Sequence, residues 1–233
     1  MQKVIFLPLC LILVFSSCKK QGCTDPNANN YNSSANENNG NCTYSLMDIE
    51  GNSYGAKSIG KQIWMTENLK VKKYRNGDTI PQVQDPLQWY YLTTGAWCYY
   101  ENDPSKGILY NWYAVNDPRG LAPSGYHVPT DAEWTVLTDF LGGESVAGGK
   151  MKSTNGWNQN GNGTNTSGFS GIPGGFRYID GLYVDIGWQG YWWSSSEYNN
   201  SGAWFRSLNY DCGTLTCEAF DKRAGFSVRC VKD

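Results

Sequence analysis

The stretch LAPSGYHVPTDAEWTVL, residues 121–137, carries the clearest structural signal in this 233-residue sequence. Thr130 and Glu133 have the S/T-x-x-E spacing of a capping box, in which each side chain satisfies a backbone N–H that the start of a helix leaves unpaired. Pro129 and Trp134 flank them at the two positions of a hydrophobic staple, which fixes the angle at which the chain enters a helix. The spacing therefore predicts a helix that begins directly after Thr130.

The apolar residues that follow define one face of this helix. Trp134, Leu137 and Leu141 recur at helical spacing, and Gly142-Gly143 supply residues that adopt a left-handed conformation at a helix end. This is the only helix that the sequence signals well.

The same stretch contains His127, the only histidine of the chain. A catalytic histidine needs a nucleophile or a carboxylate partner, and no GxSxG or other nucleophile motif accompanies this one. Because the surrounding residues specify a turn and a helix start, we interpret His127 as a packed, hydrogen-bonded turn residue. A catalytic role is the alternative.

Much of the remaining sequence consists of short aromatic or β-branched runs bounded by Gly and Asn, which predict strands and turns. Residues 53–65 are typical of a hairpin with Gly60-Lys61 as its two-residue turn, and Asn76-Gly77 marks another tight turn. Short strands are also predicted in GILYNWYAV (107–115), GYWWSSSEY (190–198), AWFRSLNY (203–210) and GFSVRCVKD (225–233).

The composition favours a compact, loop-rich extracellular protein with an aromatic core. The chain has 10 Trp, 16 Tyr and 27 Gly, and only 17% of its residues are charged. Its net charge is −2, and no basic block is long enough to follow a row of phosphates. Nucleic acid is therefore excluded as an expected partner.

Residues 1–17 have the features of a secretory signal, with one Lys, a short apolar run and small residues before Cys18. The apolar run is too short to cross a bilayer. Phe15-Ser16-Ser17-Cys18 resembles a bacterial lipobox, in which the signal is cut before a cysteine that is then acylated. We expect Cys18 to anchor an otherwise water-soluble protein to a membrane, because several acyl chains bind a bilayer firmly. Ordinary cleavage near Ser17 is the alternative.

Six cysteines remain once the signal and the lipid carrier are set aside, an even number that indicates disulfides in an exported chain. Six cysteines permit fifteen pairings, so the sequence does not decide among them. We favour three pairs: Cys23–Cys42, Cys98–Cys230 and Cys212–Cys217. No CxxC pair is present, which disfavours zinc, and no cofactor or other metal is expected.

A boundary falls near residue 45, which divides the chain into a signal peptide (1–17), a lipid anchor and linker (18–45) and one domain (46–233). The segment GCTDPNANNYNSSANENNGNCTY (22–44) is rich in Asn and has almost no aliphatic residues, so it cannot build a core of its own. It resembles a short repeat of surface proteins from Bacteroidetes. Asp25, Asn27 and Asn29 alternate as calcium ligands do, but the Gly and Glu of an EF-hand are missing, which favours a disulfide-pinned spacer.

Seven stretches of the domain, in order, resemble the Fibrobacter succinogenes major paralogous domain over roughly residues 48–233: IGKQIWMTENLKVKKYRNGDTIP, GILYNWYAV, LAPSGYHVPTDAEW, MKSTNGWN, GFSGIPGGFRYIDGLY, GYWWSSSEYNNSGAWF and GFSVRCVKD. The quoted HVPTDAEWTVL and the closing GFSVRCVKD also look like the frame of the formylglycine-generating-enzyme group, a variant of the C-type lectin-like fold. The resemblance implies an exported α+β protein of that fold, with short twisted antiparallel strands, one or two helices, long loops and no assigned activity.

Several ligand motifs of related proteins do not carry over. Cys212 and Cys217 have the five-residue spacing of the copper-binding cysteines of formylglycine-generating enzymes, but the sequence around those cysteines is absent, so we favour a structural disulfide. The EPN or QPD triplet and the WND motif of calcium-dependent lectins are not found. GGESVAGGK near residue 142 misses the residues of a phosphate loop.

The aromatic segment 187–207 holds the candidate ligand-binding residues. Adjacent Trp192 and Trp193 cannot both point inward from a strand, because successive side chains alternate between its faces. One of them is expected in the core, and the other either forms an exposed platform for a sugar ring or lies under a loop. Trp188, Trp204 and Arg206 are weaker candidates by the same reasoning.

These patterns together predict a non-catalytic binding module, anchored by lipid to the outer membrane on its periplasmic or cell-surface side. It would recognise a glycan or a surface protein. A structural accessory subunit of an outer-membrane assembly is the alternative, and a copper-dependent oxidase is a distant third.

Overall fold

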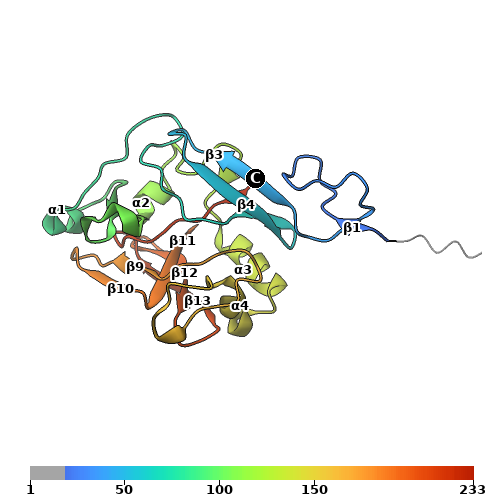
Figure 1. Cartoon of the computed structure of the whole chain (residues 1–233). Coiled ribbons are helices and arrows are strands. Elements are labelled where there is room, and N and C mark those ends of the chain that lie inside the picture. Colours follow the sequence, from blue (N-terminus) through green and yellow to red (C-terminus); the bar gives the residue numbers. More distant parts are fainter. Residues whose placement is uncertain (1–18) are drawn as a thin grey trace, which may run out of the picture.

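The computed structural model describes residues 19–233, in which strands predominate over helices (Figure 1). The strands are β1 (Gln21–Gly22), β2 (Glu37–Asn38), β3 (Thr43–Met47), β4 (Ser53–Ile59), β5 (Gln62–Met65), β6 (Trp97–Tyr99), β7 (Ile108–Tyr110), β8 (Tyr126–His127), β9 (Gly174–Arg177), β10 (Tyr183–Ile186), β11 (Gln189–Glu197), β12 (Gly202–Asn209), β13 (Leu215–Asp221) and β14 (Val231–Lys232). The helices are α1 (Pro86–Tyr90), α2 (Trp112–Val115), α3 (Asp131–Phe140) and α4 (Glu144–Met151).

Two five-stranded sheets form the body of the described chain. One has the order β3-β4-β5-β14-β8 and the other the order β10-β9-β11-β12-β13. The long hairpins β11–β12 and β12–β13 are antiparallel, whereas β11 meets β9 in parallel. The short strand β14 lies between β5 and β8, so a C-terminal segment completes a sheet that N-terminal strands begin.

The strongest local predictions are confirmed. Strands β4 and β5 form the expected hairpin, and Gly60 in its turn has a φ of 63°, a conformation that glycine adopts without strain. Helix α3 begins after Thr130, whose hydroxyl and the Glu133 carboxylate form both halves of the capping box. The helix buries Trp134 and Leu137 along the expected face.

Two strand predictions and the helix count need correction. The stretch 107–115 forms β7 but then turns into α2, capped by the Asn111 side chain. The stretch 225–233 contributes only β14 and isolated bridges. The discarded phosphate-loop stretch forms α4, which follows α3 directly. Gly148 allows α4 to pack closely against the segment that precedes β13, since a Cβ at this position would lie 2.5 Å from the Thr214 carbonyl oxygen.

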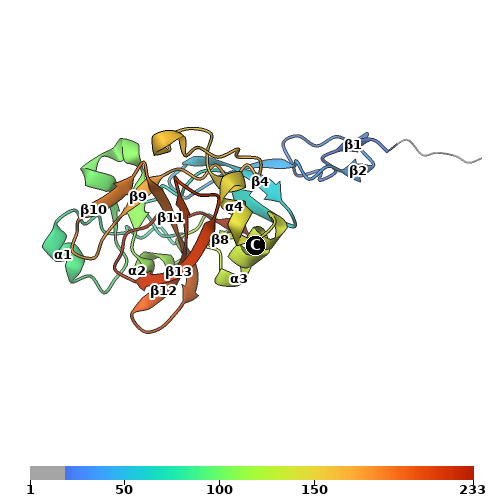
Figure 2. The same ribbon diagram turned by 90° about the horizontal axis from the view of Figure 1, so that it is seen from below.

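The N-terminal segment is organised by a disulfide and lies at one end of the molecule, with α1 and β10 at the other (Figures 1 and 2). Cys23 and Cys42 form the expected bond, which closes a loop of 19 residues and stabilises the fold by about 3 kcal/mol. Asp25 accepts hydrogen bonds from Asn27 and from the Tyr44 hydroxyl, so its carboxylate has protein partners.

Cys18 and the signal sequence lie outside the described residues. Between residues 19 and 233, no helix is long and apolar enough to span a membrane.

Candidate functional site

Trp192 and Trp193 lie on opposite faces of β11, as strand geometry requires, but both are fully buried. Trp192 packs against Phe169, with ring centroids 5.5 Å apart, and Trp193 packs against Phe226 at 4.3 Å. Since β11 is an inner strand with a packed cluster on each side, no face of it meets solvent here. The prediction of an exposed tryptophan platform at this pair is therefore wrong.

The two other candidate tryptophans are not brought together. Trp188 is 37% exposed and meets the Tyr210 ring edge-on, with the centroids 4.8 Å apart. Trp204 is half-buried beside Tyr198 on the far part of β12. Trp188 directly precedes Gln189, which pairs with Asn209 on β12. Asn209 is five residues from Trp204, a separation of roughly 17 Å along a strand. They do not form one binding surface.

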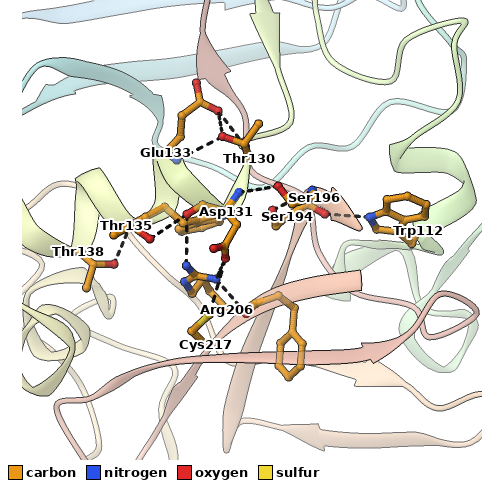
Figure 3. A network of polar contacts seen from close by, with 12 residues as sticks. Trp112, Thr130, Asp131, Glu133, Thr135, Thr138, Ser194, Ser196, Arg206 and Cys217 are labelled. Carbon is orange, nitrogen blue, oxygen red and sulfur yellow. Dashed lines mark hydrogen bonds and ion pairs between the residues drawn. The ribbon is translucent and has the colours of Figure 1, made fainter. Parts of the chain in front are cut away.

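Arg206 is buried and has a structural partner. Its Nη1 donates to Asp131 Oδ1 at 2.7 Å, at the first residue of α3, and the Cys217 thiol donates to the same oxygen (Figure 3). The Asp131 backbone N–H donates to Ser196 on β11. This network fastens the start of α3 to the sheet, so Arg206 is not available for the ligand role predicted for it.

Four of the cysteines expected in disulfides are free: Cys98, Cys212, Cys217 and Cys230. Cys98 packs with Trp89 and Leu109, whereas Cys230 belongs to a different core cluster. Burial raises the pKa of Cys98 to about 11 and that of Cys230 to about 12. Both therefore behave as small apolar core residues, and the predicted pairs Cys98–Cys230 and Cys212–Cys217 are corrected.

The described chain contains no grouping of three or more His, Cys, Asp or Glu side chains suited to a metal ion. Cys212 lies exposed in the loop between β12 and β13, and Cys217 points toward α3. Burial raises the pKa of the Cys217 thiol. The two cysteines thus differ in surroundings as well as in partners.

His127 lies in strand β8 and not in a turn, and it is hydrogen-bonded as predicted. Its Nδ1 is 2.7 Å from Asp233 Oδ1, and its Nε2 is 2.8 Å from Glu133 Oε1. Glu133 also accepts hydrogen bonds from Thr130 through its other oxygen. Burial lowers the pKa of His127, but the bonds to the two carboxylates outweigh it and the net pKa is raised. The ring links β8, α3 and the segment after β14.

A pocket of about 410 Å³, which we call the Asn68 pocket, is lined by six segments of the chain, which include the ends of β7, β9 and β10. This volume falls within the range of small-molecule sites in proteins. Its walls are mostly apolar and its backbone is rich in glycine. The lining residues are Asn68, Leu69, Lys70, Ser105, Lys106, Gly107, Ile108, Gly156, Ile172, Pro173, Gly174, Ile186, Gly187 and Ser227.

Two polar side chains in the Asn68 pocket have unused hydrogen-bonding groups. Ser227 is only 4% exposed as a residue, and its hydroxyl forms no hydrogen bond within the described chain; it is not one of the fully buried atoms that lack a partner, so it is open to the pocket. Asn68 accepts bonds from Trp192 Nε1 at 2.9 Å and from Arg229 Nη2 at 2.6 Å through Oδ1, which leaves its amide nitrogen as a free donor. Trp192 thus acts on the pocket indirectly, by orienting Asn68.

Behind Asn68 lies Arg229, which is completely buried. Its guanidinium donates to the carbonyl oxygens of Met65 and Phe169 and to Asn68 Oδ1. No ion pair within residues 19–233 involves it, so neutral oxygens make its direct contacts, and the Glu67 carboxylate acts on the charge only from a greater distance. Burial lowers the pKa of Arg229 to about 9, which reflects the cost of keeping an unpaired cation in the interior.

A second groove of about 420 Å³ continues from the Asn68 pocket. The two share Lys70, Ser105, Gly107 and Ile108, and the groove adds Glu50, Asn52, Lys72, Tyr99 and Pro104. The arrangement offers an apolar slot with fixed donors at its floor and a longer, more polar channel outside it. Such a combination suits a ligand that extends beyond a single ring.

Comparison with known families gives one match: the pattern of the Fibrobacter succinogenes major domain covers residues 58–232. The chain belongs to this family. No curated protein and no solved structure matches it. Every residue that lines the Asn68 pocket falls within the matched Fibrobacter succinogenes major domain.

The sequence did not predict the residues of this candidate site in the Fibrobacter succinogenes major domain. Asn68 and Arg229 are 161 positions apart, and neither belongs to a local motif with a known mechanism. The one available signal was that both occur in stretches quoted for the family resemblance. An Asn in ENLK and an Arg in SVRC carry no spacing that points from one to the other.

Proposed function

We propose that this protein is a lipid-anchored, extracytoplasmic binding module with a C-type-lectin-like fold, and that it holds its ligand in the Asn68 pocket. The observation that carries the proposal is that the Ser227 hydroxyl lies in the pocket lining and makes no hydrogen bond within the described chain. A hydroxyl that the protein leaves without a partner in a pocket is available to bond a ligand and fix its orientation. The free Asn68 amide supplies a second point of attachment.

The lipid anchor and the exported location rest on the sequence and on one feature of the structure. The Cys23–Cys42 disulfide is of a kind that persists in oxidising compartments outside the cytoplasm. The segment it closes adjoins residue 19, directly after the proposed lipid carrier Cys18, and projects from one end of the body (Figure 1). An anchor there would leave the opposite end free.

Binding should be tested with Ser227→Ala on an array of neutral and acidic oligosaccharides. We expect the affinity for the retained ligand to fall by about tenfold, because one ligand hydrogen bond is worth about 1 kcal/mol. The free energy of unfolding should stay the same or rise slightly, since the lost hydroxyl has no protein partner.

Ser194→Ala is the matched control. Ser194 is equally buried, but its hydroxyl accepts a hydrogen bond from the Ser196 backbone. This variant should lose about 1 kcal/mol of stability and keep full ligand affinity. If the array retains no sugar, or if Ser227→Ala binds as tightly as the unaltered protein, the proposed site is wrong.

A second candidate function, that of an accessory subunit in an outer-membrane assembly, is favoured by a different observation. Large apolar side chains are exposed on α1, just after it and next to β10, at the end of the molecule opposite the N-terminal segment: Leu87, Tyr91 and Leu182. Exposed apolar patches mark protein contacts when they are contiguous. Co-purification from native membranes that is lost in Leu87→Ser and Leu182→Ser would support this function.

A further inference from the structure

We propose that the ligand of the Asn68 pocket is an acidic sugar, with its carboxylate against Asn68 and one apolar face of its ring on the pocket wall. This inference rests on the proposed binding function and adds the chemical class of the ligand. It depends on the charges around the pocket and not on the tryptophans.

The charge of the pocket lining is one-sided. The lining contains Lys70 and Lys106 and no Asp or Glu, although the chain as a whole has a net charge of −2. Lys106 is paired with Glu101 outside the pocket, at 2.7 Å. Lys70 makes no ion pair with any residue of the described range, and its ammonium group lies near the Tyr54 ring. One unpaired cation therefore stands at the rim.

A second cation, Arg229, lies behind the floor of the pocket, with no ion pair within the described residues and only a longer-range interaction with Glu67. Arg229 polarises the Asn68 amide through the bonds to Oδ1, so the free Nδ2–H groups become stronger donors toward the pocket. The Ser227 hydroxyl is the other donor in the pocket lining. A carboxylate has two acceptor oxygens, one for each of these donors, and its charge would offset that of Arg229.

The remaining walls fit a sugar ring better than a flexible chain. Ile172, Pro173 and Ile186 offer an apolar surface for the C–H face of a pyranose. The groove that continues from the pocket contains Asn52, Glu50 and Tyr99, whose polar atoms can bond the hydroxyls of a following sugar. A neutral sugar would use these walls and the two donors, but would leave both cations unpaired.

The test compares oligogalacturonate with the same oligomer after methyl esterification, which removes the charge and keeps the ring. We expect the free acid to bind at least about tenfold more tightly, and its affinity to fall as the NaCl concentration rises. Tighter binding of the ester, or of a neutral oligosaccharide, would overturn the acidic-sugar inference and leave the binding function standing. Preference for a peptide with a free C-terminal carboxylate would overturn it equally.

Two variants sharpen the result. Asn68→Asp keeps the size of the side chain and places a carboxylate against Arg229, so the protein itself supplies the anion. We expect its thermal stability to rise and its affinity for the acid to fall at least about tenfold. Should Asn68→Asp bind oligogalacturonate as tightly as the unaltered protein, the proposed contact does not exist.

Lys70→Gln is the surface variant, which does not disturb the fold. It should weaken binding of the acid several-fold and leave binding of the ester unchanged. Lys61→Gln, in the exposed turn between β4 and β5 and outside the pocket, is the matched control and should change neither. Equal effects of the two lysine variants would contradict a charge contact at the rim. If neither the acid nor any other array component is bound, the proposed function falls along with this inference.

Discussion

At the scale of single residues, His127 shows how a side chain without a catalytic motif can still respond to pH. The imidazole lies between Glu133 and Asp233 and is raised in pKa by both. A histidine with a raised pKa in the folded state contributes stability that is fully present below its unfolded pKa of 6.5 and is lost as the pH rises through the folded value.

Glu133 has the opposite dependence. Burial raises its pKa, but hydrogen bonds from Thr130 and His127 outweigh this and hold the net pKa below the ordinary value of 4.5. Its contribution is therefore present above pH 4.5 and is lost as the pH falls through the folded pKa. The cluster should be most stabilising in the window between about pH 4.5 and 6.5, where both groups are charged.

The first prediction follows from this window. His127→Gln should lower the free energy of unfolding by about 0.5–1 kcal/mol at pH 5.5, because partly exposed ion pairs are worth little more. At pH 8.5 the loss should be smaller, because the charge-dependent contribution of His127 is lost as the pH rises through its raised folded pKa. Urea unfolding at the two pH values measures the difference. An equal loss at both would contradict a charged His127, and loss of an activity in the folded variant would point to catalysis.

At the scale of elements, α3 is held at its start from several directions. The capping box satisfies its first backbone N–H groups, and the Asp131–Arg206 pair ties its first turn to β12 (Figure 3). The local part of this arrangement is visible in the sequence as T-x-x-E. The link to Arg206 is not, because it joins residues that are far apart in the chain.

Removal of the cap gives the second prediction. Thr130→Ala should cost about 0.5–2 kcal/mol, the usual effect of losing an N-cap hydroxyl. The corresponding decrease in melting temperature is roughly 2–4 °C per kcal/mol for a domain of this size. Thr135→Ala serves as the control, because Thr135 is exposed on the same helix and bonds only a carbonyl within it. A larger effect from Thr135 than from Thr130 would refute the role of the cap.

Strand β11 explains why the tryptophan prediction failed. Alternation assigns Trp192 and Trp193 to opposite faces correctly, but it does not tell whether the second face is covered. That depends on α3, α4 and the loop around Phe169, which come together only in the folded chain.

At the scale of the whole molecule, the features that the sequence predicts correctly are those that depend on residues close together in the chain. The Gly60-Lys61 turn, the Thr130 cap and the Cys23–Cys42 bond each involve short separations, and all three are confirmed. The pairing of distant cysteines and the Asn68 pocket depend on how remote segments pack. Two buried cysteines look alike in sequence whether or not the fold brings their sulfur atoms together.

The proposed membrane anchor gives the third prediction. Cys18→Ala should release the protein from the membrane fraction, because the acyl chains would be lost. Cys212→Ala, which alters an exposed cysteine in a loop, should leave the fractionation unchanged and controls for the loss of a thiol. Mass spectrometry of the N-terminus measures acylation directly. An unacylated mature protein, or an unchanged distribution of Cys18→Ala, would disprove the lipoprotein assignment.

The position of β14 governs when the chain can fold. Val231 pairs with Trp64 on one side and with His127 on the other, so three widely separated segments must meet before this sheet is complete. Contacts between distant segments form slowly, because the intervening chain has to be ordered first. During synthesis, the sheet that contains β5, β8 and β14 therefore stays incomplete until the C-terminal residues have been made. For the export that we propose, a topology that delays folding until synthesis is nearly finished would keep the chain unfolded during transport across a membrane.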